Sequence, residues 1–351
     1  MALAKAARPD HISPIPMSTG VETLLIEDGE ADLRLDRWFK RRYPALTHGR
    51  LEKLLRTGQV RVDGKRAKSS DRVQPGQSVR VPPLKLDSVP ERQSGAAVRP
   101  EDLAALKGWI LHQDKSVIVL DKPPGLPVQG GTKSERNLDA ILAAAADTFG
   151  GRPLLVHRLD RDTSGVLVLA RNPNVARVLA EAFRGKGARK LYWALVAGKP
   201  ERPFGTIDLP LAKRVGAAGE RVVALDYDED LDLDEAGARR AKTHYATIDN
   251  AADRVTWLAL EPLTGRTHQL RVHMAALGTP ILGDGKYGGS GAFLRMEGIA
   301  KQLHLHARRI RIPHPERGTL DIKAPPPRHF TQALEALGLI ADTDADAFID
   351  A

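Results

Sequence analysis

Short apolar segments, many with alternating hydrophobic residues, recur between residues 117 and 313, and they constrain the fold more than any other feature. The clearest are VIVL at 117–120, LLVHRLD at 154–160, GVLVLAR at 165–171, LYWALVAG at 191–198, TWLALEPL at 256–263 and HLHARRIRIP at 304–313. Alternating residues line the two faces of a β-strand. A segment with helical spacing, Val175 to Phe183, lies between two of them. We therefore predict an α+β domain built on a mixed or antiparallel sheet.

Positive charge is concentrated in one stretch near the N-terminus. Residues 34–85 hold fifteen Lys and Arg but only four Asp and Glu, a net charge of +11, whereas the whole chain carries +9. A basic module beside a larger, nearly neutral domain indicates a polyanionic partner. An ordinary solvated helix face would explain scattered charge, but not charge concentrated in one module.

The same stretch predicts a small domain of two helices and a hairpin. Leu35, Trp38 and Phe39 recur at helical spacing before Pro44, and a second helix is expected from about Thr47 until Gly58. The segment QVRVDGKRA at 59–67 predicts two strands joined by an Asp-Gly turn, and PGQSVRV at 75–81 predicts a last strand. In this order of elements, residues 34–81 resemble the S-four-type RNA-binding module. The resemblance implies a small α/β domain whose expected RNA contacts are Arg50, Lys53, Arg56, Lys65 and Arg66.

Composition divides the rest of the chain and excludes some classes of protein. The chain has no cysteine, which excludes disulfides, thiolate catalysis and cysteine zinc sites. No segment approaches the ~18 apolar residues of a membrane span, and the first residues lack the apolar core of a secretory signal. We expect a cytoplasmic protein with a flexible tail at 1–20, the RNA-binding domain at 21–85, a polar linker at 86–105, a catalytic domain at 106–340 and a C-terminal tail at 341–351.

The segment VHRLDRDTSG at 156–165 carries the strongest chemical signal. Asp160 ends an apolar run and enters a Thr-Ser-Gly turn, which would present its carboxylate at a rigid edge of the sheet. Arg158 and Arg161 would favour its ionised form and attract phosphate. An Asp before a turn is often only a turn former or a helix cap, so spacing alone leaves both roles open.

Family resemblance decides between these roles. HRLDRDTSG matches the HRLDxxTSG motif of the RluA-type pseudouridine synthases, RKLYWALV at 189–196 resembles their K-x-Y-x-A-x-V strand, and TGRTHQLRVH at 264–273 resembles their TGRTHQ motif. DKPPG at 121–125 and GDGKYG at 283–288 also match, and all five motifs follow in the family's order. The chain is identified as a member of this family. Its basic module and its GLPVQGG loop most resemble the RluC-like subgroup.

The resemblance implies roles for individual residues. Asp160 takes the place of the family's catalytic aspartate, Tyr192 that of its active-site tyrosine, and Arg271 that of the arginine which keeps the aspartate ionised. Arg158 takes the place of the arginine that fills the space left by a flipped-out uridine. Arg266 and His268 are further expected RNA contacts.

Pseudouridine formation breaks the bond between ribose and uracil, turns the base and joins it again through carbon. A carboxylate can trap or stabilise the sugar or the base while the bond is open, and a tyrosine can stack on the uracil. The sequence leaves open whether Asp160 attacks the ribose or the base. Because the reaction is an isomerisation without redox change, we expect no cofactor and no metal. His304 and His306 share one strand face, but strand packing or RNA contact explains them better than a metal site.

The expected substrate is a set of specific uridines in large-subunit (23S) ribosomal RNA, with no obligate protein partner. Two alternatives remain. One is a transfer RNA pseudouridine synthase, since members of the family without a basic module act on smaller RNAs. The other is an RNA-binding ribosome-assembly factor in which the catalytic domain only docks.

Overall fold

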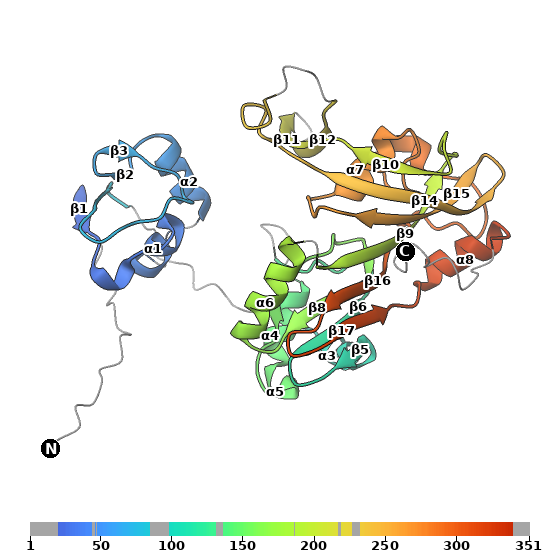
Figure 1. Ribbon diagram of the computed structural model, residues 1–351, viewed down its shortest axis with the longest axis horizontal. Helices are drawn as coiled ribbons and strands as arrows, with labels where there is room; N and C mark the ends of the chain where they lie inside the picture. Colours follow the sequence, from blue (N-terminus) through green and yellow to red (C-terminus); the bar gives the residue numbers. More distant parts are fainter. Residues whose placement is uncertain are drawn as a thin grey trace. The chain divides into compact units, whose positions relative to one another are not determined.

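The computed structural model describes residues 20–43, 46, 48–84, 98–130, 136–185, 187–216, 219–226 and 232–339. They form two compact units, one within residues 1–94 and one within 95–351 (Figure 1). We call them the N-terminal unit and the C-terminal unit. The predicted tails at 1–19 and 341–351 and residues 86–97 of the predicted linker lie outside the described residues. Within the described parts of both units, no helix combines the length and the apolar character that crossing a bilayer requires.

The N-terminal unit contains the two helices and the hairpin that the sequence predicts. Its elements are β1 (Glu22–Leu25), the 3-10 helix η1 (Asp28–Glu30), α1 (Leu35–Arg42), α2 (His48–Arg56), β2 (Arg61–Val62), β3 (Lys65–Arg66) and β4 (Ser78–Val81). The strands form a four-stranded sheet in the order β1-β4-β2-β3. Asp63 and Gly64 join β2 to β3 with φ angles of 48° and 74°, and positive φ at both central residues is typical of a tight hairpin turn. The apolar faces of α1 and α2 enclose a core around Trp38 and Phe39.

The C-terminal unit contains helices and the strands of two sheets. Its helices are α3 (Pro100–Gly108), α4 (Leu138–Ala144), α5 (Ala146–Phe149), α6 (Pro173–Arg184), α7 (Gln269–Ala276), the 3-10 helix η2 (Gly289–Ala292) and α8 (Arg328–Ala336). Its strands are β5 (Ile110–Gln113), β6 (Val117–Lys122), β7 (Leu154–Leu155), β8 (Ser164–Ala170), β9 (Arg189–Ala197), β10 (Phe204–Asp208), β11 (Leu211–Gly216), β12 (Gly219–Ala224), β13 (Ala238–Arg239), β14 (Lys242–Ala251), β15 (Val255–Pro262), β16 (Leu305–Pro313) and β17 (Thr319–Lys323).

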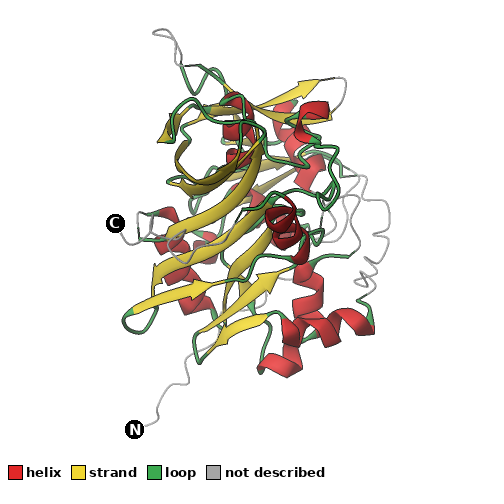
Figure 2. Ribbon diagram, turned by 90° about the vertical axis from the view of Figure 1, so that its right-hand side faces the viewer, coloured by secondary structure: helices red, strands yellow, loops and turns green. Residues whose placement is uncertain are grey.

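The large sheet confirms the predicted α+β class. Its main path runs β10-β14-β15-β9-β16-β8-β6-β5, with β17 paired to β16 and β7 paired to β8, and the strands lie side by side in one curved sheet (Figure 2). In the described part of this sheet the pairings are antiparallel except for that of β8 with β16, so the sheet is mixed. A separate three-stranded sheet has the order β12-β11-β13.

Alternating side chains place cores on both faces of the large sheet, as the sequence pattern requires. On β6, Ile118 and Leu120 pack in a core with α4, whereas Val117 and Val119 pack in a core with α6. The same alternation on β9 and β15 separates a core with α8 from a core with α7. The central strands are therefore covered on both faces over most of their length.

Two sequence expectations about the elements need correction. The predicted linker at 86–105 ends too late, because α3 begins at Pro100 and belongs to the C-terminal unit. Pro100 suits the first turn of a helix, Leu106 is buried, and the carboxylate of Asp102 accepts hydrogen bonds from Arg136. The C-terminal unit therefore begins before residue 106.

The second correction concerns the predicted strand at 154–160, of which only β7 (Leu154–Leu155) is formed. The backbone amide of Val168 on β8 donates to Nε2 of His157 at 2.8 Å. The imidazole thus takes the place of a strand carbonyl, and the pairing ends there. Residues 157–160 leave the sheet as an irregular segment and carry Asp160 away from the ladder.

His304 and His306 are both fully buried, which favours the strand-packing interpretation over RNA contact. The Nδ1 atom of His306 lies 2.9 Å from Oγ of Ser164, and its Nε2 lies 3.2 Å from the carbonyl oxygen of Ala324. This histidine therefore ties the start of β8 to the middle of the sheet.

Candidate active site

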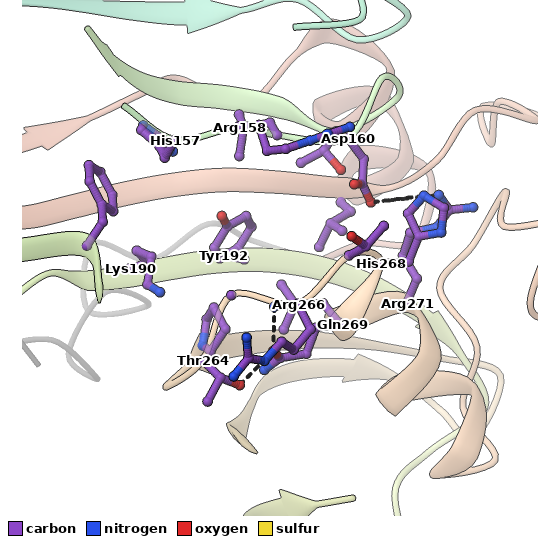
Figure 3. A pocket seen from close by; sticks show the side chains of 18 residues that line it. His157, Arg158, Asp160, Lys190, Tyr192, Thr264, Arg266, His268, Gln269 and Arg271 are labelled. Carbon is purple, nitrogen blue, oxygen red and sulfur yellow. Dashed lines mark hydrogen bonds and ion pairs between the residues drawn. The ribbon is translucent and has the colours of Figure 1, made fainter. Parts of the chain in front are cut away.

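One cavity of about 270 Å³ lies between the irregular segment before β8, strand β9 and the start of α7 (Figure 3). It is lined by all six site residues that the sequence predicts within the C-terminal unit: Arg158, Asp160, Tyr192, Arg266, His268 and Arg271. The other five predicted residues, Arg50, Lys53, Arg56, Lys65 and Arg66, lie in the N-terminal unit on α2 and β3. Of these, Lys53, Arg56, Lys65 and Arg66 are exposed and Arg50 is partly exposed.

A tight turn presents the carboxylate of Asp160 to the cavity. The amide of Thr163 donates to the carbonyl of Asp160 at 3.2 Å, which closes the turn predicted from RDTSG. Immediately after it, Gly165 has a φ of 106°, and a Cβ atom there would lie 2.2 Å from the carbonyl oxygen of Ala307 on β16. The close approach of β8 and β16 therefore requires glycine, and it fixes where the turn leaves the sheet.

The side chain of the buried residue Lys122 supports the turn that carries Asp160. The sequence did not lead us to predict this role. Lys122, at the end of β6, is fully buried, and its Nζ donates to the carbonyls of Pro123, Leu126 and Arg161 at 2.8, 2.9 and 3.0 Å. Burial lowers the pKa of Lys122 to about 7, although nearby carboxylates oppose the change. The three bonds tie the loop after β6 to the loop that carries Asp160. The match of DKPPG at 121–125 to the family was the sequence signal that could have drawn attention to Lys122.

Arg271 has a nearer partner than the expected one. Its Nε and Nη2 atoms each donate to the carboxylate of Asp284 at 2.8 Å, whereas its Nη1 lies 3.8 Å from Oδ2 of Asp160. Burial alone would lower the pKa of Arg271, but the hydrogen bonds and charge of Asp284 raise it above its ordinary value. The expected pairing of Arg271 with Asp160 is present at 3.8 Å, but these two hydrogen bonds go to Asp284. Asp284 orients the guanidinium, and one nitrogen remains directed toward Asp160.

Asp284 is itself fixed by the loop that contains it. Its Oδ1 also accepts from the backbone amides of Lys286 and Tyr287 at 3.2 Å, and the residue is 1% exposed. The sequence GDGKYG indicated a match to the family but no role for its residues. The sequence reasoning therefore missed two residues of functional interest, Asp284 and Tyr287.

His268, which belongs to the TGRTHQ motif, also lies near Asp160. Its Nε2 lies 3.9 Å from Oδ2 of Asp160, and its Nδ1 lies 2.7 Å from the hydroxyl of Tyr287. Gln269 holds the loop before it, because its side-chain oxygen accepts from Oγ1 of Thr264 at 2.7 Å and from the amide of Arg266 at 3.0 Å. The loop is therefore braced from within.

Tyr192, on β9, lines the cavity beside Lys190, with His157 across from them (Figure 3). Burial raises the pKa of Tyr192, and the charge of Asp160 adds to the effect, so the phenol is protonated at neutral pH. Burial lowers the pKa of His157 to about 3, which agrees with the hydrogen bond that its Nε2 accepts from Val168. The ring of His157 stacks on Phe183, with the ring centroids 4.3 Å apart.

These side chains form an anionic centre in a basic, partly apolar cavity. Asp160 is 20% exposed and faces a guanidinium and an imidazole, while a neutral phenol and aromatic rings can contact a planar group. Such a carboxylate can act as a nucleophile or stabilise a cationic sugar. Among the residues that the structure describes, no three His, Asp or Glu side chains are grouped as metal ligands.

Comparisons with known families match both units. The family model described as RNA pseudouridylate synthase matches residues 116–276, and the model of the S4 domain matches residues 33–79. The first match contains Asp160, Tyr192, His268 and Arg271, and the second contains the basic residues of α2 and β3.

Comparisons with individual proteins agree. The ribosomal large subunit pseudouridine synthase C of Salmonella typhi is 35% identical over 324 residues, which cover 90% of this chain and 97% of that protein. The protein of the same name from Vibrio cholerae is 32% identical over 320 residues, with 90% and 96% covered. Among solved structures, human RNA pseudouridylate synthase domain containing 4 is 29% identical with a TM-score of 0.56, covering 69% of this chain and 97% of that one.

Proposed function

Because the chain belongs to the RNA pseudouridylate synthase family, we propose that it converts uridines of large-subunit ribosomal RNA to pseudouridine through the carboxylate of Asp160. Membership of the family makes the chain an enzyme that isomerises uridine in RNA. The observation that supports the role of Asp160 is its place in the cavity, 3.8 Å from Arg271 and with Tyr192 among the lining residues.

In this proposal the target uridine leaves its helical stack and enters the cavity, where the base lies against Tyr192. The N1–C1′ bond breaks, and the carboxylate of Asp160 stabilises or traps the fragment that it faces. The uracil turns, and its C5 bonds to C1′. Arg271 places a positive charge 3.8 Å from the carboxylate of Asp160. Arg158, exposed at the mouth of the cavity, is proposed to occupy the gap left in the RNA.

The proposed substrate rests on the relatives and on the N-terminal unit. The curated relatives are named for the ribosomal large subunit, and the S4 domain match covers the stretch in which positive charge is concentrated. Positive charge binds RNA through its phosphates without reading sequence. We accordingly assign the substrate to ribosomal RNA, the place of action to the cytoplasm, and no obligate protein partner to the reaction.

The decisive experiment replaces Asp160 by Asn and measures pseudouridine formation in large-subunit ribosomal RNA transcripts. Loss of the charge with retention of shape should abolish turnover and leave RNA binding nearly unchanged. A matched control is Asp162→Asn, because Asp162 lies in the same turn but is 40% exposed and pairs with Arg161. Turnover by Asp160→Asn within about tenfold of the parent, a barrier change below ~1.4 kcal/mol, would contradict the assignment.

The same assay tests the substrate. Transfer RNA transcripts are offered beside large-subunit transcripts under identical salt. Faster modification of transfer RNA would replace the proposed substrate by the alternative. If the parent binds RNA but modifies neither class, the chain is an RNA-binding factor and not a synthase.

A further inference from the structure

His268 has a backbone conformation that residues other than glycine seldom adopt. Its φ and ψ are 55° and 19°, in the left-handed region, at the residue that precedes α7. Such a conformation costs on the order of 1–3 kcal/mol and persists where the surrounding structure enforces it, often at functional sites. Its result here is that the imidazole is directed into the cavity toward Asp160 (Figure 3).

Both ring nitrogens of His268 face a group that can exchange a proton. Nδ1 lies 2.7 Å from the hydroxyl of Tyr287, and Nε2 lies 3.9 Å from Oδ2 of Asp160. Asp160, His268 and Tyr287 therefore form a chain of carboxylate, imidazole and phenol. Two of its three members, Asp160 and His268, line the cavity.

Tyr287 is held firmly enough to orient the imidazole. The guanidinium carbon of Arg271 lies 5.1 Å from its ring centroid and that of Arg221 lies 5.2 Å from it, while Lys286 Nζ lies at 5.6 Å. Its oxygen also interacts with the backbone amide of Val222. A hydroxyl has one hydrogen and two lone pairs, so Tyr287 can still accept a hydrogen bond from Nδ1.

The surroundings of His268 favour its neutral form. Burial lowers its pKa, and Arg271 and Lys286 lower it further, whereas the negative charges of Asp160 and Asp284 oppose the change. A charged, exposed imidazole would suit a phosphate contact best, whereas this side chain is only 22% exposed. A neutral imidazole with one free lone pair is instead suited to accept a proton.

We propose that His268 carries the proton that the isomerisation moves from C5 to N1 of the uracil; the inference rests on the proposed function. After the C5–C1′ bond has formed, C5 still bears its hydrogen and N1 has none. Nε2 of His268 removes the proton from C5, and the C–H electron pair restores the conjugation of the ring. The imidazolium then returns the same proton to N1, and His268 is again neutral. No other reactant is consumed.

Asp160 and Tyr287 assist this transfer without exchanging the proton themselves. Once the new bond is formed, Asp160 is a free carboxylate and stabilises the imidazolium beside it. The hydroxyl oxygen of Tyr287 accepts a hydrogen bond from Nδ1–H, and this keeps the lone pair on Nε2. Tyr287 is therefore a positioning residue.

The test compares single-turnover rates on RNA with hydrogen or deuterium at C5 of the target uridine. In His268→Gln we expect the rate to fall about 10²-fold or more, because general acid–base groups contribute at least that much. Proton removal should become rate-limiting, so the isotope effect should exceed that of the parent. Tyr287→Phe should show the same change on a smaller scale. His244→Gln is the matched control, because His244 bonds Thr206 and lies outside the cavity.

Chemical rescue distinguishes the loss of a proton-transfer group from a folding defect. Added imidazole should restore part of the rate of His268→Ala, but not that of Asp160→Asn, and thermal unfolding reports the fold of each variant. A slow His268→Gln whose isotope effect equals that of the parent would overturn the proposal, as would a variant that only binds RNA less tightly. If the parent itself forms no pseudouridine, it is the proposed function that fails.

Discussion

At the scale of single residues, the orientation of the Arg271 guanidinium depends on the carboxylate to which it is hydrogen-bonded. The fully buried Asp284 binds two of its nitrogens at 2.8 Å each, and Asp160 meets the third at 3.8 Å. A bidentate pair fixes the plane of the guanidinium, so the direction of its charge toward Asp160 is set before RNA arrives. Preorganised charge of this kind needs no reorganisation during the reaction.

Replacing Asp284 by Asn should therefore damage both stability and catalysis. Removing one partner of a buried ion pair lowers the free energy of unfolding by about 3–5 kcal/mol, because the other charge remains buried without compensation. We expect a lower unfolding temperature and a lower rate of the chemical step, with RNA affinity little changed. Asp321→Asn is the control, since Asp321 pairs in the same bidentate way with Arg309 on β16, away from the cavity. Equal turnover in both variants would contradict the orienting role of Asp284.

At the scale of elements, the parallel pairing between β8 and β16 positions the turn that carries Asp160. His306 pairs with Ser164 and Ala307 with Gly165 in this register, and no Cβ fits at Gly165. The turn from Asp160 to Thr163 begins directly before this pairing. Its geometry therefore depends on backbone packing between segments that are about 140 residues apart in the chain.

Gly165→Ala should force the two strands apart and displace Asp160. The new methyl group would meet backbone atoms of Ala307, which have little freedom to move, in addition to the cost of a positive φ. We expect turnover to fall together with the unfolding temperature. Gly318→Ala provides the comparison, because Gly318 has a φ of 73° but open space around its Cβ position, so only the conformational cost of about 1 kcal/mol applies. Similar losses in both variants would show that strain, not the close approach of the strands, dominates.

At the scale of the whole molecule, the chain has two units that each have their own core. The N-terminal core around Trp38 and Phe39 contains residues 24–84 only, and the cores of the C-terminal unit contain residues from Val98 onward. Each unit therefore has the means to remain folded when the surface of the other is changed. Charge in the N-terminal unit can be altered without touching the cavity.

A full-length variant with Lys53, Arg56 and Lys65 replaced by Gln should bind ribosomal RNA less tightly and with a flatter salt dependence. Each phosphate that the variant fails to neutralise reduces the slope of log K against log salt by roughly 0.7–0.9. Turnover of a short stem-loop that presents the uridine should stay near the parent value. The control replaces Arg152, Arg177 and Lys199, which are exposed on the C-terminal unit and pair with single carboxylates. An unchanged slope in the first variant would assign the N-terminal unit to a protein partner instead.

The class of the fold, the two basic helices with their hairpin, and six residues of the cavity could all be predicted from the sequence. Periodicity reveals which face of a strand or helix is buried, and short motifs carry chemistry because their residues are adjacent in the chain. Three contacts could be seen only in the folded chain: Arg271 binds Asp284, His268 faces Tyr287, and Lys122 supports the turn of Asp160. The folded chain also differs from the sequence prediction at residues 156–160. They were predicted to continue the strand, but they leave the sheet where the side chain of His157 accepts a hydrogen bond from β8. The physical reason is that such contacts depend on how distant segments pack. Local preferences fix the conformation of each segment, but the distance between two side chains is set by the sheet that joins them.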